Sequence, residues 1–236
     1  MVIDASGWLF LAIVCLGVPY LAIRSNRRLG TRPLPMSRRR FFLQTIFAQL
    51  YLFVIAIVAA QRNHIDLLSM PESPLLAWTL GAAFFGIMLA VMRFRWPSRD
   101  HESKERLYRL LPQNGSDLPL YFLVSLAAGI CEETVYRGVA TPLLVEVTNN
   151  LFAGVLISAA VFAVAHIIQG KRAALGVFGV ALMAQSIVLI SQSLLPAMAA
   201  HAAYDAVAGV LMSRWYRREL ESAPQPEVLS QTTPIR

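Results

Sequence analysis

The chain has 236 residues, of which 56% are hydrophobic and 15% are charged, and its formal net charge is +7. Ordinary soluble domains carry about 25% charged residues, so this chain is far too apolar to be one of them. The composition argues against a water-soluble globular enzyme and predicts an all-α, polytopic membrane protein.

Apolar runs recur along the chain at lengths close to the ~20 residues that a helix needs to cross a bilayer. They predict a transmembrane helical bundle of about seven spans. The predicted spans are 6–23, 41–60, 74–92, 118–145, 151–169, 173–190 and 194–213. The fourth run is long for one span, and Gly138 and Pro142 within it can kink the helix.

The domain organisation predicted from these runs is simple. Residues 1–213 form a single integral-membrane domain, with a motif-bearing core at 117–213. Residues 214–236 form a cytoplasmic tail. We expect disorder beyond residue 223, because prolines alternate there with polar residues that cannot build a core.

Basic residues gather in the odd-numbered loops between these runs. They are Arg24, Arg27, Arg28, Arg32, Arg38, Arg39 and Arg40 in the first loop, Arg93, Arg95, Arg99, Lys104, Arg106 and Arg109 in the third, Lys171 and Arg172 in the fifth, and Arg214, Arg217 and Arg218 after the last run. The even-numbered loops carry only Arg62. By the positive-inside rule, this alternation predicts an outside N-terminus and a cytoplasmic C-terminus. The membrane expected for the protein is the bacterial inner (plasma) membrane. The positive charge therefore reports topology and contact with membrane lipid, and no nucleic-acid partner is expected.

The fourth run carries two adjacent glutamates, Glu132 and Glu133, followed by Arg137. A charge near the centre of a bilayer costs about 2.5–3.5 kcal/mol on insertion scales, so this group needs a reason. On a helix, Glu133 and Arg137 are i,i+4 neighbours and are predicted to pair. Glu132 is rotated by about 100° from Glu133 and can face a cavity as a general base. The alternative is structural: a buried ion pair that holds the helices together.

Two later runs each carry a histidine. Phe162 precedes His166 by four residues, so the phenylalanine can pack over the imidazole ring. His201 and Asp205 share a helical face at the same spacing, among alanines that allow a neighbouring helix to approach closely. Asp205 can orient the tautomer of His201, or the two can shape a pocket for an oxyanion. A lone histidine on an apolar helix is more often a hydrogen-bonded packing residue, so the functional reading of His166 depends on the other two motifs.

These residues fit two hydrolytic mechanisms. In the first, Glu132 and His166 activate a water directly, while His201 and Asp205 stabilise the tetrahedral intermediate. In the second, His166, His201 and Glu132 hold a zinc ion whose bound water attacks. No pair of histidines has the HExxH spacing, so the version without a cofactor is favoured and zinc remains the alternative.

The three motifs, taken in order, resemble those of the CAAX protease and bacteriocin-processing family, also called CPBP or Abi. They are Glu132-Glu133 with Arg137, Phe162 with His166, and His201 with Asp205. The family includes the type II CAAX prenyl endopeptidases. The resemblance extends over roughly residues 117–213 and implies an intramembrane endopeptidase, once classed as a metalloprotease and now often as glutamate-dependent.

Carried over by motif position, the resemblance implies that Glu132 is the base and that His166 is its partner on the water. His201 and Asp205 would form the oxyanion region, with Glu133 and Arg137 in support. Eukaryotic prenyl endopeptidases carry asparagine where this chain has Asp205, and bacterial relatives use either residue. An ionised aspartate is a poor oxyanion donor, so here Asp205 either orients His201 or is itself protonated.

The sequence thus predicts an intramembrane protease that cleaves a membrane-bound or membrane-proximal protein or peptide. The rival is a non-proteolytic membrane protein, in which the same buried charges form a proton or ion relay or a scaffold of the bacteriocin-immunity type. Transporters also carry intramembrane carboxylates, but the chain shows no inverted repeat and no pair of broken helices in matching halves.

Overall fold

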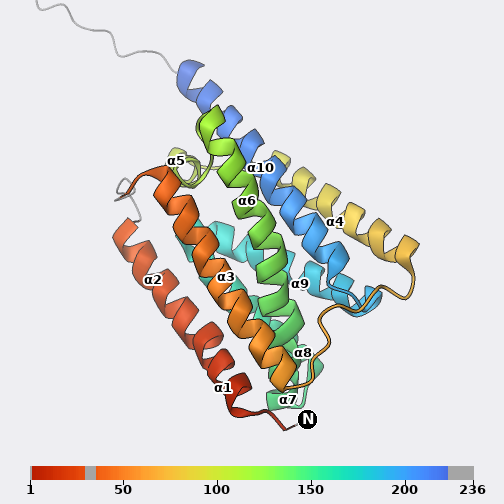
Figure 1. The fold of residues 1–236 in the computed structure, drawn as a ribbon. Coiled ribbons are helices and arrows are strands. Elements are labelled where there is room, and N and C mark those ends of the chain that lie inside the picture. Colours follow the sequence, from red (N-terminus) through yellow and green to blue (C-terminus); the bar gives the residue numbers. More distant parts are fainter. Residues whose placement is uncertain (1, 30–35, 223–236) are drawn as a thin grey trace, which may run out of the picture.

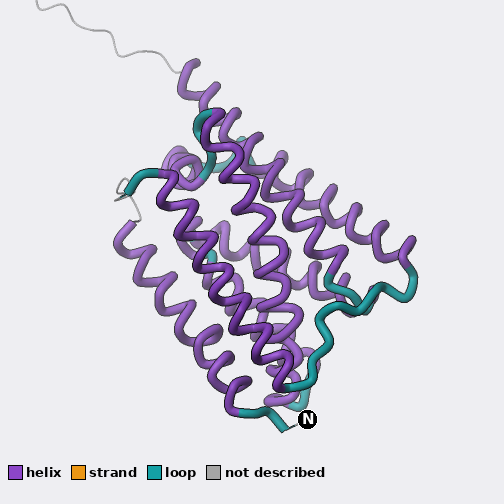
Figure 2. Tube along the Cα trace, viewed as in Figure 1, coloured by secondary structure: helices purple, strands orange, loops and turns teal. Residues whose placement is uncertain are grey.

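The structure is a computed structural model that describes residues 2–29 and 36–222. Within these ranges the chain is helical, without strands (Figure 2). The α-helices are α1 (Ala5–Ala12), α2 (Val18–Leu29), α3 (Arg38–Arg62), α4 (Pro74–Arg95), α5 (His101–Leu110), α6 (Leu118–Ala127), α7 (Thr141–Thr148), α8 (Leu151–Ala165), α9 (Lys171–Ser191) and α10 (Leu195–Ser222). Segments of π-helix lie at Ile13–Gly17, Ala128–Glu132 and Thr134–Ala140, and 3-10 turns lie at Gly115–Asp117 and Ile167–Gln169.

Six helices of the described chain are long and apolar enough to cross a membrane. They are Ala5–Arg27, Arg38–Arg62, Pro74–Arg95, Gly115–Thr148, Lys171–Ser191 and Leu195–Ser222. The fifth predicted span, 151–169, is a shorter apolar helix that ends at Ala165, because the backbone at His166 leaves the α conformation. The prediction of an integral-membrane helical bundle is therefore confirmed, and one of its seven expected spans is replaced by a shorter helix.

Proline and asparagine residues set several of these boundaries. Pro74 is the first residue of α4, a position where its missing N–H costs no helical hydrogen bond. Asn149 adopts the left-handed conformation at φ 49°, and the side chain of Asn150 accepts a hydrogen bond from the backbone N–H of Ala153. The tight turn between α7 and α8 therefore comes from two asparagines, a residue type that tolerates this backbone better than most.

The basic connections gather at one end of the bundle, near α5, and the N-terminus lies at the opposite end (Figure 1). The predicted loop 93–116 contains the helix α5, whose N-terminus is capped by Asp100. The backbone N–H of Ser103 holds the pKa of Asp100 below its usual value. Arg172, at the start of α9, approaches the same carboxylate at 4.0 Å. Two of the basic loops are therefore in contact, as expected when positive loops share one side of a membrane.

Helix α10 continues to Ser222, beyond the predicted end of the last span at residue 213. Its last turns are held by Glu219, which accepts hydrogen bonds from the indole of Trp96 at 2.9 Å and from Lys104 at 2.8 Å. The segment 214–222 is thus helical and anchored to α5. The predicted disorder beyond residue 223 lies outside the described residues.

The helix from Gly115 to Thr148 runs through the bundle and packs against both α3 and α10 (Figure 1). Gly129 allows α10 to come close, since a Cβ atom added there would lie 2.6 Å from the carbonyl oxygen of Met198. A side chain at this position would push α10 away. This close crossing brings the residues of the first and third motifs within reach of each other.

Candidate active site

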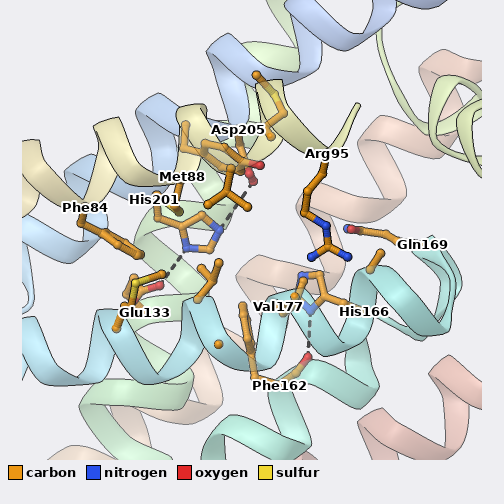
Figure 3. A pocket seen from close by; sticks show the side chains of 18 of the residues that line it. Phe84, Met88, Arg95, Glu133, Phe162, His166, Gln169, Val177, His201 and Asp205 are labelled. Atoms are coloured by element: carbon orange, nitrogen blue, oxygen red, sulfur yellow. Dashed lines mark hydrogen bonds and ion pairs between the residues drawn. The ribbon is translucent and has the colours of Figure 1, made fainter. Parts of the chain in front are cut away.

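The three predicted motifs meet in one polar cluster inside the bundle (Figure 3). Glu132 and Arg137 lie on the two π-helical segments, and Glu133 lies between these segments. His166 caps the C-terminus of α8, and His201 lies in the second turn of α10. Segments of π-helix are rare and often occur at functional sites. The sequence predicted an ordinary α-helix here, and no residue pattern indicated the π-helical segments.

Glu133 is the most enclosed member of the cluster, with a side chain that is 1% exposed. Its Oε1 atom lies 3.3 Å from Nη1 of Arg137, which confirms the predicted pairing. The same oxygen lies 2.8 Å from Nδ1 of His201, so the imidazole donates to it. Because the carboxylate holds both a cation and a histidine, Glu133 fixes the position of α10 relative to the fourth span.

Phe162 organises the aromatic side of the cluster. The guanidinium of Arg137 lies over its ring at 4.3 Å, an arrangement typical of cation–π contacts. The rings of Phe162 and His166 lie 4.4 Å apart, which confirms that the phenylalanine packs on this imidazole. Phe162 therefore links the buried ion pair to the histidine of the second motif.

Glu132 faces another direction and has different neighbours. Its Oε1 atom accepts a hydrogen bond of 3.0 Å from Nε2 of Gln49, on α3. Its Oε2 atom lies 3.7 Å from Nε2 of His166 and 4.0 Å from Nε2 of His201. Two imidazole nitrogens from two other helices therefore converge on one carboxylate oxygen.

The tautomer of His166 follows from its hydrogen bond to the backbone. Nδ1 lies 2.8 Å from the carbonyl oxygen of Phe162, which can only accept, so Nδ1 carries the proton. In the neutral ring Nε2 is then an acceptor, and it is this nitrogen that faces Glu132. The end of α8 at His166 frees the ring to make this contact.

Asp205 lies 3.6 Å from Nε2 of His201, through its Oδ2 atom. This distance is too long for a hydrogen bond. Direct orientation of the His201 ring comes instead from Glu133, on the other nitrogen. Whether Asp205 also orients His201 or shapes an oxyanion pocket stays a prediction.

Several polar atoms of the cluster have no hydrogen-bond partner within the protein. Across the described residues, the buried side-chain atoms of this kind are Arg38 Nε, Gln49 Oε1, Glu132 Oε2, Glu133 Oε2 and Arg137 Nη1. All but the first belong to this cluster. Buried polar groups are nearly always satisfied, so such a concentration indicates a place that receives water or substrate.

Two cavities border the cluster. The first, of about 260 Å³, lies between α4, α9 and α10 and is lined by Glu133 and His201 together with apolar side chains such as Phe84 and Met88. The second, of about 430 Å³, lies between α3, α5, α6 and α10 and is lined by Glu132. Five residues line both and form the wall between the two cavities: Arg99, His166, Gln169, Tyr204 and Asp205.

Sequence reasoning missed the contributions of α3 and α4. Gln49 was counted only as part of an apolar run, although a glutamine within a span is itself a signal of a polar contact. Arg95 was assigned to a topological loop, yet in Figure 3 its guanidinium points towards His166 and Gln169. Gly176 leaves room for it, since an added Cβ would lie 3.2 Å from Arg95 Nη1.

In the alternative mechanism, His166, His201 and Glu132 hold a zinc ion. In the described part of the chain, no group of three or more histidine, cysteine, aspartate and glutamate side chains is arranged to hold a metal ion. One nitrogen of each histidine is already bonded to protein, His166 to a carbonyl and His201 to Glu133. A histidine that binds a metal usually holds its other ring nitrogen in a bond of this kind, so these contacts are compatible with both mechanisms, and zinc stays the alternative prediction.

Residues 114–207 match the family model of Rce1-like proteins, described as type II CAAX prenyl endopeptidase Rce1-like. This segment is similar to a CAAX protease domain. It contains all three motifs, and it supports an integral-membrane endopeptidase of the CAAX type with a membrane-associated protein or peptide as substrate. No curated protein and no solved structure matches the chain. Gln49 and Arg95 lie outside the matched segment, on helices that the family model does not cover.

Proposed function

We propose that the CAAX protease-like domain hydrolyses a peptide bond with a water molecule activated by Glu132 and His166. The observation that carries the proposal is the pair formed by Glu132 Oε2 and His166 Nε2, which face each other at 3.7 Å. Neither atom has a hydrogen-bond partner in the protein, and both are acceptors. A water that donates one hydrogen bond of about 2.8 Å to each atom fits between them. Its lone pairs are then left for attack on a carbonyl carbon.

The proposed reaction is general-base catalysis. The water oxygen attacks the scissile carbonyl carbon, and Glu132 takes the proton as the new C–O bond forms. The π electrons of the carbonyl move to its oxygen and give a tetrahedral oxyanion. When the C–N bond breaks, Glu132 returns the proton to the leaving nitrogen, so that one water is consumed and an acid and an amine are released.

His201 is proposed to stabilise the oxyanion. Its Nδ1 atom donates to Glu133, and its Nε2 atom lies 4.0 Å from Glu132 Oε2, next to the proposed water. With carboxylates near both ring nitrogens, we assign His201 the doubly protonated form, so that Nε2 donates to the developing negative charge. Glu133, Arg137 and Phe162 act by holding the two histidines in place.

The substrate class follows from the surroundings. The walls of both cavities are mostly apolar side chains, and the cluster lies within helices that cross the membrane. Such a site suits an apolar or lipid-anchored peptide segment better than a soluble polar one. We propose a membrane-bound or membrane-proximal peptide as substrate, in a bacterial inner (plasma) membrane.

The test is a cleavage assay of the purified protein in liposomes against a library of apolar peptides. Wild type is compared with Glu132→Gln and His166→Ala, each with and without a strong zinc chelator, and with Glu72→Gln as the matched control outside the cluster. The proposal is supported if Glu132→Gln and His166→Ala lose activity while wild type keeps its activity in the presence of the chelator. Activity that the chelator removes and zinc restores would contradict the metal-free mechanism. Cleavage by Glu132→Gln at the rate of wild type would contradict the assignment of the base.

A further inference from the structure

Gln49 is a polar residue in the largely apolar stretch 46–60 of α3. It lies on α3, outside the family-matched segment, and is only 9% exposed. Its amide nitrogen faces a carboxylate oxygen, Glu132 Oε1, which can only accept. The orientation of the amide is therefore fixed by chemistry, with Nε2 on Glu132 and Oε1 pointing elsewhere.

The other end of this amide has no partner. Gln49 Oε1 is buried and makes no hydrogen bond within the protein. A buried acceptor without a donor costs free energy, and more so within a membrane, where bulk water does not reach. Methionine or leucine would fill the same space without that cost. The glutamine oxygen thus needs a donor that comes from outside the protein.

The second cavity is the place where that donor can come from. Gln49 and Glu132 line this cavity, the one of about 430 Å³ between α3, α5, α6 and α10, and neither lines the other. His166 also lines it, so the proposed water faces the same space. The remaining wall includes apolar side chains of Phe41, Phe42, Leu52, Val124, Val135 and Met212. An apolar peptide in this space offers one kind of strong donor, its backbone N–H groups.

We propose that Gln49 binds the substrate backbone and positions the base at the same time, an inference that rests on the proposed hydrolysis. Nε2 holds Glu132 Oε1, which turns Oε2 towards His166 and the water. Oε1 accepts a hydrogen bond from a peptide N–H group near the scissile bond. The peptide therefore lies in the cavity between α3 and α10, with its scissile carbonyl at the wall that this cavity shares with the one lined by His201.

A chemical change in the substrate tests the acceptor directly. The peptide that wild type cleaves best is synthesised with each backbone amide near the scissile bond replaced in turn by an ester, which removes one N–H group and little else. At one position we expect kcat/KM to fall by roughly five- to tenfold in wild type, the size of one lost hydrogen bond. In Gln49→Met the same replacement should have no effect. An equal loss in both proteins would overturn the assignment of the acceptor.

The kinetic parameters separate the two roles of Gln49. Loss of the substrate contact raises KM, whereas misplacement of Glu132 lowers kcat, so Gln49→Met should change both and Gln49→Asn should restore neither fully. The matched control is Gln185→Met, since Gln185 is a buried glutamine whose Oε1 is satisfied by Thr141 at 3.1 Å. Gln185→Met should lower the thermal stability of the protein. The ratio of kcat/KM for the amide substrate to kcat/KM for the ester analogue should stay as in wild type. If this amide-to-ester ratio changes equally in Gln49→Met and Gln185→Met, the role of Gln49 is only structural.

Binding gives a readout that does not need turnover. In the Glu132→Gln variant an acceptor for Gln49 Nε2 remains, and the affinities of a fluorescent apolar peptide and its ester analogues are compared by titration. We expect the amide to bind roughly five- to tenfold more tightly than one ester analogue, and the difference to vanish when Gln49→Met is added. If the amide peptide and all its ester analogues bind with equal affinity, the inference is overturned, even if wild type cleaves the peptide. If wild type cleaves nothing, the binding difference would still place a peptide beside Gln49 while the proposed hydrolysis fails.

Discussion

Glu132 and Glu133 are neighbours in the sequence but belong to two different regions of the cluster. Glu133 faces a closed region, where its oxygen holds Arg137 at 3.3 Å and His201 at 2.8 Å. Glu132 faces an open region, where one oxygen is held by Gln49 and the other is left towards His166. The side chain of Glu133 is 1% exposed and that of Glu132 is 20% exposed.

The difference teaches how a membrane protein can carry two carboxylates side by side. Through one oxygen, the carboxylate of Glu133 holds both a cation and an imidazole, so it supports the fold. The carboxylate of Glu132 instead has an oxygen that faces His166 and borders the second cavity, where it can take a proton, and it persists because the closed region next to it holds the surrounding helices. We therefore expect substitutions in the open region to change activity and substitutions in the closed region to change stability.

The largest effect is expected for Glu132→Gln, in the open region. The amide keeps the shape and an acceptor for Gln49 but cannot take a proton, so the cleavage rate should fall by about 10²–10⁴-fold. The melting temperature in detergent should stay within the error of wild type. The measurements are the initial rate of peptide cleavage and a thermal unfolding curve. A variant that melts much lower would place Glu132 in the closed region as well.

The next effect is expected for Arg137→Ala, in the closed region. The substitution removes Arg137 from the buried carboxylate of Glu133 and leaves His201 as its one remaining partner, and breaking a buried pair in this way costs about 3–5 kcal/mol. Protein yield and the melting temperature should both drop, and the matched control is Arg62→Ala at the exposed end of α3. Unchanged thermal stability would show that the pairing contributes nothing to the fold.

A smaller effect is expected for Phe162→Leu, which lies between the two regions. The leucine keeps an apolar side chain but removes the ring under Arg137, a contact worth about 0.5–2 kcal/mol. The packing on His166 is lost as well, so activity should fall together with stability. Phe152→Leu, on the exposed face of the same helix, serves as the control. If only one of the two quantities changes, Phe162 belongs to one region alone.

The smallest effect is expected for Asp205→Asn. Asp205 lies 3.6 Å from His201 and does not make the bond that orients the ring. We expect kcat/KM to change by less than about tenfold, which corresponds to 1.4 kcal/mol. A fall as large as that of Glu132→Gln would move Asp205 next to the reacting atoms, and a clear gain would favour an oxyanion donor at this position.

Much of this architecture could be predicted from the sequence, because the signals are local. The length of an apolar run predicts a spanning helix, and the i,i+4 spacing correctly paired Glu133 with Arg137 and placed Phe162 on His166. The order of the three motifs also predicted the family later matched at residues 114–207. Each of these conclusions depends only on residues within a few turns of one helix.

Other features depended on how the helices pack against one another, and only the tertiary structure decided them. The hydrogen bond from Gln49 to Glu132 and that from His201 to Glu133 join residues that are 83 and 68 positions apart. The π-helical turns and the early end of α8 likewise had no local signal. The physical reason is that a helical segment satisfies its own backbone, whereas neighbours on one helix satisfy only part of a buried polar side chain, and the remaining partner comes from another helix. Which helix supplies that partner is set by packing, here by the close approach of α10 at Gly129.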